Sequence, residues 1–129
     1  MNAENNCLKT DIGDVQYDYL VLATGSTSNF FGNKEIEQNS MPMKSIPEAL
    51  DLRSLILQNF EKSLIETDII KKHALLNFVV LGGGPTGVET SGAIAELKKH
   101  VIPNDYPEMD LNKINIYLVE NSPELLGPM

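Results

Sequence analysis

Three short apolar runs stand out along the chain. Residues 17–23 end in a continuous apolar stretch, and residues 76–81 and 114–119 consist mostly of Leu, Val, Ile, Phe and Tyr. The continuous apolar end of the first run, residues 20–23, is typical of a strand covered on both faces. We therefore expect each of the three runs to form a strand. Residues 8–16 alternate loosely around a turn signal at residues 11–14, which predicts a hairpin or edge strand.

A long segment between the first two runs has helical periodicity. Ser45 and Glu48 have the spacing of a capping box, and the predicted helix extends from there to about Glu66. A short second helix follows, capped by Thr67 or Asp68. The apolar stripe of the long helix is formed by Leu52, Leu55, Ile56, Phe60 and Leu64.

The other connections follow from helix and turn signals. The pattern predicts a helix over residues 86–100, a loop over residues 103–111 and a new helix that begins at Ser122. Residues 30–43 are expected to be irregular, because glycine and proline interrupt them. Strands and helices in this order predict an α/β fold, with a partial, doubly wound, Rossmann-like parallel sheet and a long connecting helix.

The second apolar run leads directly into a cluster of glycines. Gly82, Gly84 and Gly87 have the Gly-x-Gly-x-x-Gly spacing of a dinucleotide-binding turn, although an ordinary strand–turn–helix corner is the alternative. Gly82 permits a tight turn, Gly84 lets a pyrophosphate approach the backbone, and Gly87 lets the helix lie close to the strand. The helix N-terminus then offers unpaired N–H groups to the phosphates. The candidate site is completed by Gly83, Pro85 and Thr86.

Glu120 follows the third apolar run. In a strand–turn–helix–strand unit that binds a dinucleotide, an acid here accepts hydrogen bonds from the adenosine ribose; a surface acid at a strand end is the alternative. The usual gap from the turn is about 20 residues. Here 33 positions separate Gly87 from Glu120, because residues 100–113 form an insertion. A carboxylate repels a 2′-phosphate and no Arg or Lys stands at the next two positions, so NADH is favoured over NADPH.

Two further candidates are weak from spacing alone. Glu89 lies two positions after Gly87 in the first helical turn. An acid there either stabilises the helix dipole or is aimed at the nicotinamide end of the cofactor. Ala23, Thr24 and Gly25 follow the first predicted strand, as many strand-to-loop exits do.

Composition narrows the class of protein. The 129 residues include 10 Lys and Arg against 18 Asp and Glu, and the net charge of -8 argues against a nucleic-acid surface, which needs clustered cations. Cys7 is the only cysteine, so the chain forms no internal disulfide or cysteine-rich zinc site. His73 and His100 have no partner at ligand spacing, and we expect no metal. The lone cysteine fits a reduced setting, and we expect a cytoplasmic protein. No apolar run reaches the ~18 residues of a membrane span.

The order of these signals resembles a known family. The segment that ends in Ala23-Thr24-Gly25, followed later by the glycine turn, is similar to the flavoproteins with two dinucleotide-binding domains, the pyridine nucleotide-disulfide oxidoreductases. Within that superfamily, three segments are most similar to the type II (single-subunit, non-proton-pumping) NADH dehydrogenases. These segments are residues 30–32, residues 44–50 and residues 105–110.

The resemblance implies two cofactors, FAD and NADH. It places Ala23, Thr24 and Gly25 beside FAD. It also implies that the glycine turn holds the NADH pyrophosphate and that Glu120 holds the adenosine ribose. Glu89 matches a family acid near the place where nicotinamide meets flavin, and is the implied catalytic residue. The implied reaction is hydride transfer from NADH to the flavin, followed by reduction of a quinone.

The resemblance also divides the chain into parts of an incomplete flavoprotein. Residues 1–43 correspond to a remnant of the FAD-binding domain, residues 44–76 to a helical connector, and residues 77–129 to the N-terminal half of the NADH-binding domain. We expect an internal fragment that is inactive alone and that self-associates as a homo-oligomer, because missing strands leave apolar faces and sheet edges bare. The whole enzyme is expected to be peripheral on the cytoplasmic face of the membrane.

Two other functions remain open at this point. One is another NADH-dependent flavoprotein reductase, which acts on ferredoxin, sulfide or a disulfide. The other is a non-catalytic nucleotide-binding or assembly module. Nucleotide binding that does not depend on a flavin would distinguish the module from the enzymes.

Overall fold

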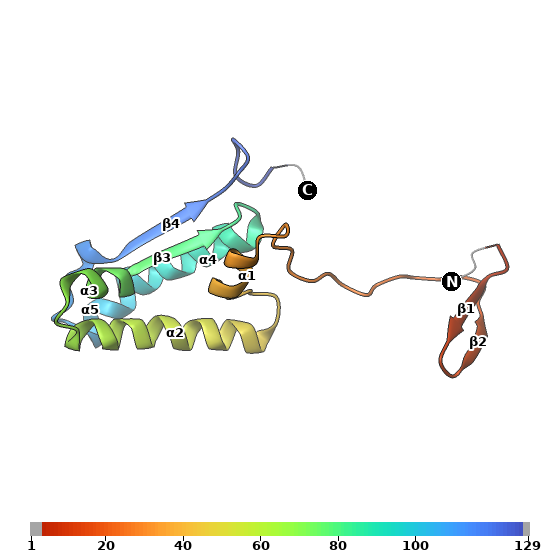
Figure 1. Ribbon diagram of the computed structural model, residues 1–129, viewed down its shortest axis with the longest axis horizontal. Helices are drawn as coiled ribbons and strands as arrows, with labels where there is room; N and C mark the ends of the chain where they lie inside the picture. The colour runs from red at the N-terminus through yellow and green to blue at the C-terminus, as the bar shows by residue number, and fades with distance from the viewer. Residues whose placement is uncertain (1–3, 128–129) are drawn as a thin grey trace.

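The computed structural model describes residues 4–127. Its body is a strand–helix–strand unit in which β3 (Asn77–Leu81) and β4 (Asn115–Val119) form a parallel pair. The connecting helix α4 (Pro85–Glu96) and the long helix α2 (Ile46–Ile65) lie on the same side of this pair (Figure 1). The predicted α/β class, the parallel pairing and the long helix are confirmed.

The two faces of the strand pair differ. On one face Phe78 is buried, and Val80 and Ile116 pack against the core under the helices. The other face is bare, because the described residues supply helices to one side only (Figure 1). The expectation that missing strands leave an apolar face of the sheet bare is therefore confirmed. The apolar side chains on the bare face are about half exposed, and they are Val79, Leu81, Tyr117 and Val119. Asn77 and Asn115, joined by a hydrogen bond of 2.9 Å, lie at the amino end of the same face.

The core is centred on Phe60 of α2, whose side chain is completely buried. Its ring centroid lies 5.5 Å from that of Phe78, in an edge-to-face arrangement at 61°. The ring of Tyr106 lies 6.3 Å away on another side. Ile102 and Ile114 fill the same cluster with 0% and 1% exposure. Phe60 therefore joins the long helix to the strand and to the segment between α4 and β4.

The predicted helix caps are confirmed. Ser45 Oγ accepts the N–H of Glu48 at 3.4 Å, and Glu48 Oε2 accepts the N–H of Ser45 at 2.7 Å, which makes a reciprocal capping box. Hydrogen bonds from the N–H of Lys44 and from Ser45 lower the pKa of Glu48. Helix α3 (Ile69–Leu75) is capped by Asp68, one of the two predicted candidates.

The helical segment after the glycines is longer than predicted. Helix α4 continues through a π-helical turn, η1 (Leu97–Val101), into α5 (Ile102–Asp105), so the start of the predicted loop is helical. Pro103 has no N–H and crowds the preceding turn, and the N–H of Ile102 bonds five residues back instead of four. A 3-10 turn, η2 (Leu111–Lys113), then leads into β4.

The N-terminal part lies apart from the body (Figure 1). The predicted hairpin is confirmed, since β1 (Cys7–Thr10) pairs antiparallel with β2 (Gly13–Gln16). The predicted strand over residues 17–23 is wrong. Residues 17–30, here called the connector, form no strand, and Val21 in it is 85% exposed. An apolar run of this kind forms a strand only beside a partner strand, and no described segment pairs with the connector.

The segment after the connector contains a helix that the sequence pattern did not predict. Helix α1 (Lys34–Asn39) lies within residues 30–43, which were expected to be irregular. Asn33 is its N-cap, and its Oδ1 accepts the N–H groups of Glu35 and Ile36 at 3.1 Å each. Asn is among the strongest N-cap residues, so Asn33 was a sequence signal for this helix. The prediction missed it because it relied on the glycine and proline content of the segment.

The predicted helix that begins at Ser122 is also wrong. Residues 121–126, here called the strap, form bends and turns. The N–H of Ser122 donates to the carboxylate of Glu120, and the N–H of Leu126 donates to the carbonyl oxygen of Gly83. These N–H groups therefore have hydrogen-bond partners without forming a helix.

Candidate functional site

The glycine turn, residues 82–87, connects the end of β3 to the first turn of α4 (Figure 1). It therefore lies at the carboxyl edge of the parallel strands, outside which ligands of open α/β sheets bind. Gly82 has a φ of +103°, a conformation that only glycine adopts freely. Its N–H donates to the carbonyl oxygen of Val119 at 2.9 Å, so the turn begins directly at the sheet.

Gly87 is where helix and strand approach most closely. A Cβ on this residue would overlap the carbonyl oxygen of Gly82 and would lie 3.0 Å from the carbonyl carbon of that residue. It would also lie 3.5 Å from Leu118 Cδ1 on β4. The position therefore needs glycine for packing, as the sequence predicted.

Gly84 has the opposite environment. No heavy atom lies within 4 Å of the place where its Cβ would stand, so the backbone here faces open space. Gly84 is the N-cap of α4 and has no side chain to bond the first amides of the helix, and Pro85 carries no N–H. The N–H groups of Thr86 and Gly87 are therefore the first of the helix, and no side chain caps them. Amides of this kind, together with the helix dipole, bind phosphate groups.

Glu120 is held against the same turn. Its Oε2 accepts the N–H of Gly83 at 2.6 Å, and its Oε1 accepts the N–H of Ser122 at 2.7 Å. These hydrogen bonds, first that of Ser122 and then that of Gly83, lower the pKa of Glu120 below its ordinary value of 4.5. The structure thus brings together two groups that are 37 positions apart in the sequence. The insertion before β4 does not displace the acid.

The lowered pKa predicts a specific pH dependence. A carboxylate whose pKa falls on folding stabilises the protein fully above its unfolded pKa, and this contribution is lost as the pH falls through the folded pKa. We expect Glu120→Gln to unfold at a lower temperature than the parent chain at pH 7. The difference should shrink from about pH 4.5 downward. Thermal unfolding of both proteins between pH 7 and pH 3 measures it.

The comparison of the two proteins also removes the effect of Glu48, whose pKa is lowered in the same direction in both. A difference in melting temperature that stays constant from pH 7 to pH 3 would show that Glu120 is not held as a carboxylate in the folded chain.

The other predicted site residues do not join this group. Glu89 is exposed on α4, beyond the first turn of the helix. Ala23, Thr24 and Gly25 are exposed in the connector, and no heavy atom lies within 4 Å of the Cβ position of Gly25. The roles of these four residues therefore stay predictions from the resemblance.

Sequence reasoning missed a contact that the strap makes with the glycine turn. The N–H of Leu126 donates to the carbonyl oxygen of Gly83 at 2.9 Å. Leu125 Cδ2 lies 2.6 Å from the place where a Cβ on Gly83 would stand. The only signal in the sequence was the glycine at position 83, which also fits the general pattern of the turn, so the contact was not foreseeable.

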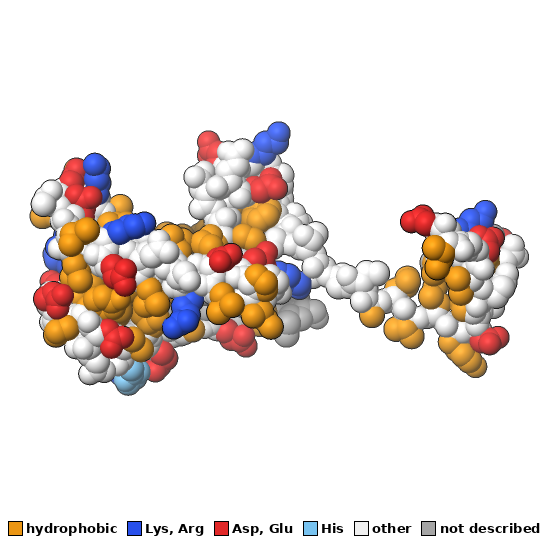
Figure 2. Space-filling model, turned by 90° about the horizontal axis from the view of Figure 1, so that it is seen from below, with side chains coloured by type: hydrophobic (Ala, Val, Ile, Leu, Met, Phe, Trp, Pro, Cys, Tyr) orange, Lys and Arg blue, Asp and Glu red, His pale blue; other side chains and the backbone are white. Residues whose placement is uncertain are grey.

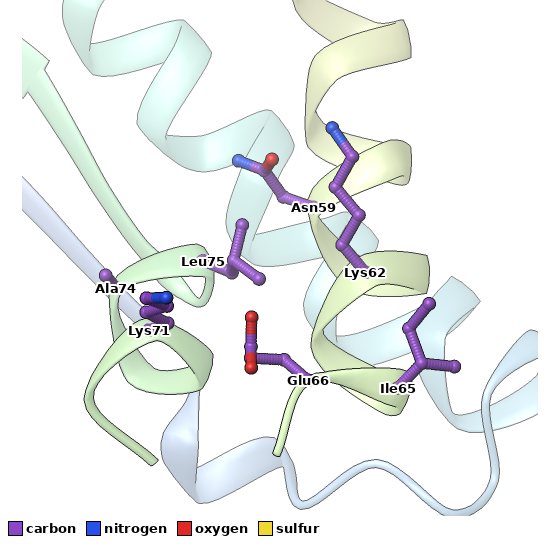
Figure 3. A pocket seen from close by; sticks show the side chains of 7 residues that line it. All are labelled: Asn59, Lys62, Ile65, Glu66, Lys71, Ala74 and Leu75. Atoms are coloured by element: carbon purple, nitrogen blue, oxygen red, sulfur yellow. The ribbon is translucent and has the colours of Figure 1, made fainter. Parts of the chain in front are cut away.

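A hollow of about 590 Å³ lies between α2 and α3 (Figure 3). It is lined by the side chains of Lys62, Ile65 and Leu75, among others, and it is wide open. It adjoins the amino end of β3, whereas the glycine turn follows the carboxyl end (Figure 1). Because ligands of open α/β sheets bind at the carboxyl ends, this hollow is not the candidate site.

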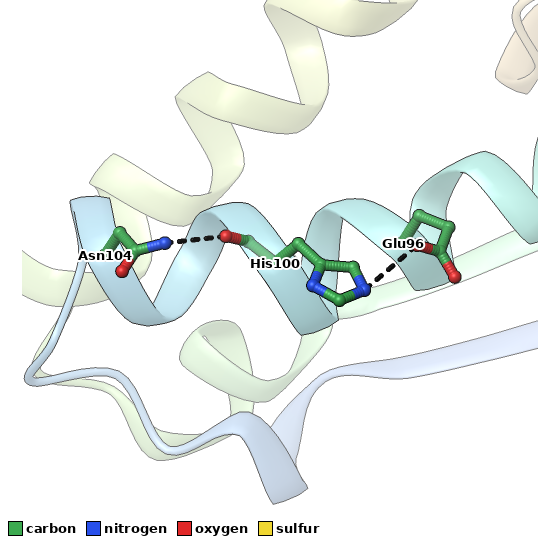
Figure 4. A network of polar contacts seen from close by, with 3 residues as sticks. All are labelled: Glu96, His100 and Asn104. Atoms are coloured by element: carbon green, nitrogen blue, oxygen red, sulfur yellow. Dashed lines mark hydrogen bonds and ion pairs between the residues drawn. The ribbon is translucent and has the colours of Figure 1, made fainter.

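A polar network follows the outer side of the helical segment (Figure 4). His100 Nε2 lies 3.1 Å from Glu96 Oε2, and Asn104 Nδ2 donates to the carbonyl oxygen of His100 at 2.7 Å. Both members of the ion pair are more than half exposed, so the pair contributes little to stability. No group of three or more His, Cys, Asp or Glu that could hold a metal occurs among residues 4–127.

Comparison with protein families decides the class of this chain. The model of the family described as pyridine nucleotide-disulphide oxidoreductase matches residues 2–129. The chain belongs to this family. The family resemblance inferred from the sequence is therefore confirmed, and the glycine turn lies in an oxidoreductase fold.

Curated relatives within this oxidoreductase family point to one group. The chain is 40% identical over 113 residues to the type II NADH:quinone oxidoreductase Ndh of Mycobacterium tuberculosis, which covers 88% of this chain and 24% of that protein. It is 38% identical over 114 residues to the external alternative NAD(P)H-ubiquinone oxidoreductase B3 of Arabidopsis thaliana, covering 88% of this chain and 20% of that mitochondrial protein. The chain thus spans about a quarter or less of the length of these relatives.

A solved oxidoreductase structure agrees with the sequence relatives. NDH2 of Plasmodium falciparum, in complex with NADH, matches with a TM-score of 0.76 and 31% identity, over 88% of this chain and 23% of that chain. The Rossmann-like fold class is therefore confirmed in three dimensions. Within the described residues, no helix combines the length and the apolar character needed to cross a bilayer.

Proposed function

We propose that the glycine turn and Glu120 bind NADH, and that this binding serves hydride transfer to FAD and reduction of a quinone in a type II NADH dehydrogenase. The observation that carries the proposal is the position of the Glu120 carboxylate, bonded to Gly83 beside the open backbone of Gly84. The relatives named as NADH:quinone and NAD(P)H-ubiquinone oxidoreductases support this choice over ferredoxin, sulfide or disulfide reductases.

The residues present fit a dinucleotide. The absence of a Cβ on Gly84 lets a pyrophosphate approach the backbone, and the amides at the start of α4 donate to its oxygens. Glu120, an acceptor in its ionised form, takes hydrogen bonds from the ribose hydroxyls. Its charge opposes a 2′-phosphate, so NADH is preferred to NADPH.

The flavin part of the proposal depends on other residues. A bound flavin would supply the electron acceptor for the hydride, and Ala23, Thr24 and Gly25 would lie beside it. These residues are exposed in the connector, so no step is derived through them. Glu89 would orient the nicotinamide end from α4. A place on the cytoplasmic face of the membrane belongs to the same proposal.

The experiment that tests the proposal uses Gly84→Val. Open space surrounds this position and its φ of −73° suits any residue, so the substitution leaves the fold intact while it blocks the approach of the pyrophosphate. We expect Gly84→Val to bind NADH and ADP-ribose at least about tenfold more weakly, a loss of about 1.4 kcal/mol or more. Isothermal titration measures the affinities, and thermal unfolding checks the fold.

The matched control is Gly92→Val, which makes the same change on the same helix, also in open space. It should bind both nucleotides like the parent chain. Equal affinities in the Gly84→Val and Gly92→Val proteins would contradict the NADH site. Binding of NADH with no flavoprotein activity in any longer protein that contains this chain would favour the non-catalytic module.

We also propose that this chain self-associates through the bare face of β3 and β4. Four apolar side chains on that face are about half exposed, and parallel sheets normally have such faces covered, because contact of apolar surface with water is unfavourable. Figure 2, which looks from the side of α2, shows that further hydrophobic side chains are exposed on the body. We expect light scattering to give a mass above 14.3 kDa, the mass of one chain.

The variant Tyr117→Lys, which places a charge on the bare face, should shift the mass toward that of one chain. Ile12→Lys makes a comparable change at a position that is 96% exposed in the β1–β2 hairpin, and it should leave the mass unchanged. A monomeric parent chain would disprove self-association.

A further inference from the structure

Strand β4 has one edge that no strand occupies among residues 4–127, because β3 is its only partner there. The N–H of Asn115 donates to the carbonyl oxygen of Leu76, just before β3, at 3.0 Å. Backbone groups alternate in direction along a strand, so the N–H and carbonyl groups of Ile116 and Leu118 point away from β3. This free edge therefore offers donors and acceptors to a further strand.

The free edge of β4 carries none of the features that usually prevent pairing. Natural edge strands are protected by charged side chains or proline. The sequence of β4, Asn-Ile-Tyr-Leu-Val, contains neither. No residue of β4 is buried, whereas Phe78 of β3 is, so β4 is the more exposed strand of the pair.

The connector contains a segment with the opposite deficiency. Residues 19–23, Tyr-Leu-Val-Leu-Ala, have the composition of a strand and also lack charge and proline. Tyr19, Val21 and Leu22 in this segment are 94%, 85% and 66% exposed. Within the described chain, residues 18–28 make no hydrogen bond. The segment therefore has both backbone groups and apolar side chains available for a partner.

We propose that residues 19–23 of the connector add as a strand to the free edge of β4 in a second copy of this chain. The added strand pairs the backbone groups of both segments and removes apolar side chains of the connector from water. In its own copy the connector runs away from β4, so we assign the pairing to another copy (Figure 1). Mutual exchange forms two such ladders in one closed dimer. The inference does not depend on the NADH site.

Hydrogen exchange of backbone amides, followed by nuclear magnetic resonance, tests the added strand. The Ile116 and Leu118 amides of the parent chain should exchange about tenfold more slowly than those of the double variant Val21→Pro, Leu22→Pro. Proline donates no hydrogen bond, and neighbouring residues of a strand point to opposite edges, so two prolines in succession disrupt either alignment. The matched control, Thr27→Pro with Ser28→Pro, changes the same exposed connector outside the apolar run and should exchange like the parent chain.

A mixture of two labelled chains shows whether the strand comes from another copy. One chain carries isotope-labelled nitrogen and the other a nitroxide attached at Ser26→Cys, while Cys7→Ser removes the only native cysteine from both. We expect the nitroxide to broaden the Ile116 and Leu118 amide signals of the isotope-labelled chain. This measurement needs no proline, so it decides the question even if the double proline variant does not fold.

Each remaining outcome contradicts the exchange. Ile116 and Leu118 amides that exchange equally fast in the parent chain and in Val21→Pro, Leu22→Pro overturn the added strand. Slow exchange without broadening between copies means that the connector pairs within its own chain, and a monomeric parent chain likewise excludes a second copy. Titration with NADH keeps the two proposals apart, because a parent chain that binds no NADH overturns the NADH site and leaves the exchanged strand standing.

Discussion

Replacing Gly87 with alanine is expected to lower the free energy of unfolding by about 3 kcal/mol, because the new methyl group has no space. The Cβ would overlap the carbonyl oxygen of Gly82, while Leu118 Cδ1, at 3.5 Å, closes the other side in ordinary van der Waals contact. Both contacts lie at the junction of β3, β4 and α4. The backbone cannot move there to make room unless the helix separates from the sheet. NADH binding should be lost together with stability, since the same backbone forms the site.

Thermal unfolding followed by circular dichroism measures this effect, and a fall in melting temperature of about 10 °C or more is expected. Gly92→Ala is the control on the same helix. No heavy atom lies within 4 Å of its Cβ position. Alanine there should raise stability by about 0.5–1 kcal/mol, because it reduces the freedom of the unfolded chain. If both alanine variants melt at the same temperature, the close approach at Gly87 is not real.

Phe60→Ala is expected to cost about 3–5 kcal/mol, through lost burial and the cavity that remains. Phe60 is completely buried and contacts the rings of Phe78 and Tyr106. It therefore packs α2 against β3 and against the segment between α4 and β4. A small domain is stable by only about 5–15 kcal/mol. The variant should therefore unfold at much lower denaturant concentration, or lose its cooperative transition.

Phe31→Ala removes the same side chain from a position that is 90% exposed. Its effect should lie within about 0.5 kcal/mol of zero, as for most surface substitutions. Urea unfolding of the three proteins makes the comparison. A loss in Phe60→Ala no greater than that in Phe31→Ala would mean that α2 is not packed on the strands.

The parts that were predictable from the sequence are those that depend on neighbouring residues. The capping box of Ser45 and Glu48 involves residues three positions apart, and its geometry is local. The strands β3 and β4 are marked by continuous β-rich runs, and the glycine spacing between β3 and α4 reflects the steric limits of one turn. Asp68 was one of two candidates for the cap of α3, and its carboxylate satisfies the first amides of that helix.

The parts that failed depend on segments distant in the sequence. Residues 17–23 have the pattern of a buried strand, yet a strand needs a partner, and no described segment pairs with them. Ser122 has the local signal of a helix start, but Glu120 and Gly83 bond the N–H groups of the strap instead. Local preference is worth a few tenths of a kcal/mol per residue, and such tertiary bonds override it.

The sequence by itself determined the glycine turn, the acid after β4, the long capped helix and the family to which these belong. Each of these features depends on residue types that act on their near neighbours in the sequence: a glycine without a Cβ, a carboxylate, or a hydroxyl that caps a helix. Only the tertiary structure decided that Glu120 bonds to Gly83 and that the strap covers the turn with Leu125. These features join residues that are far apart along the chain, and their energies exist only once the chain has folded.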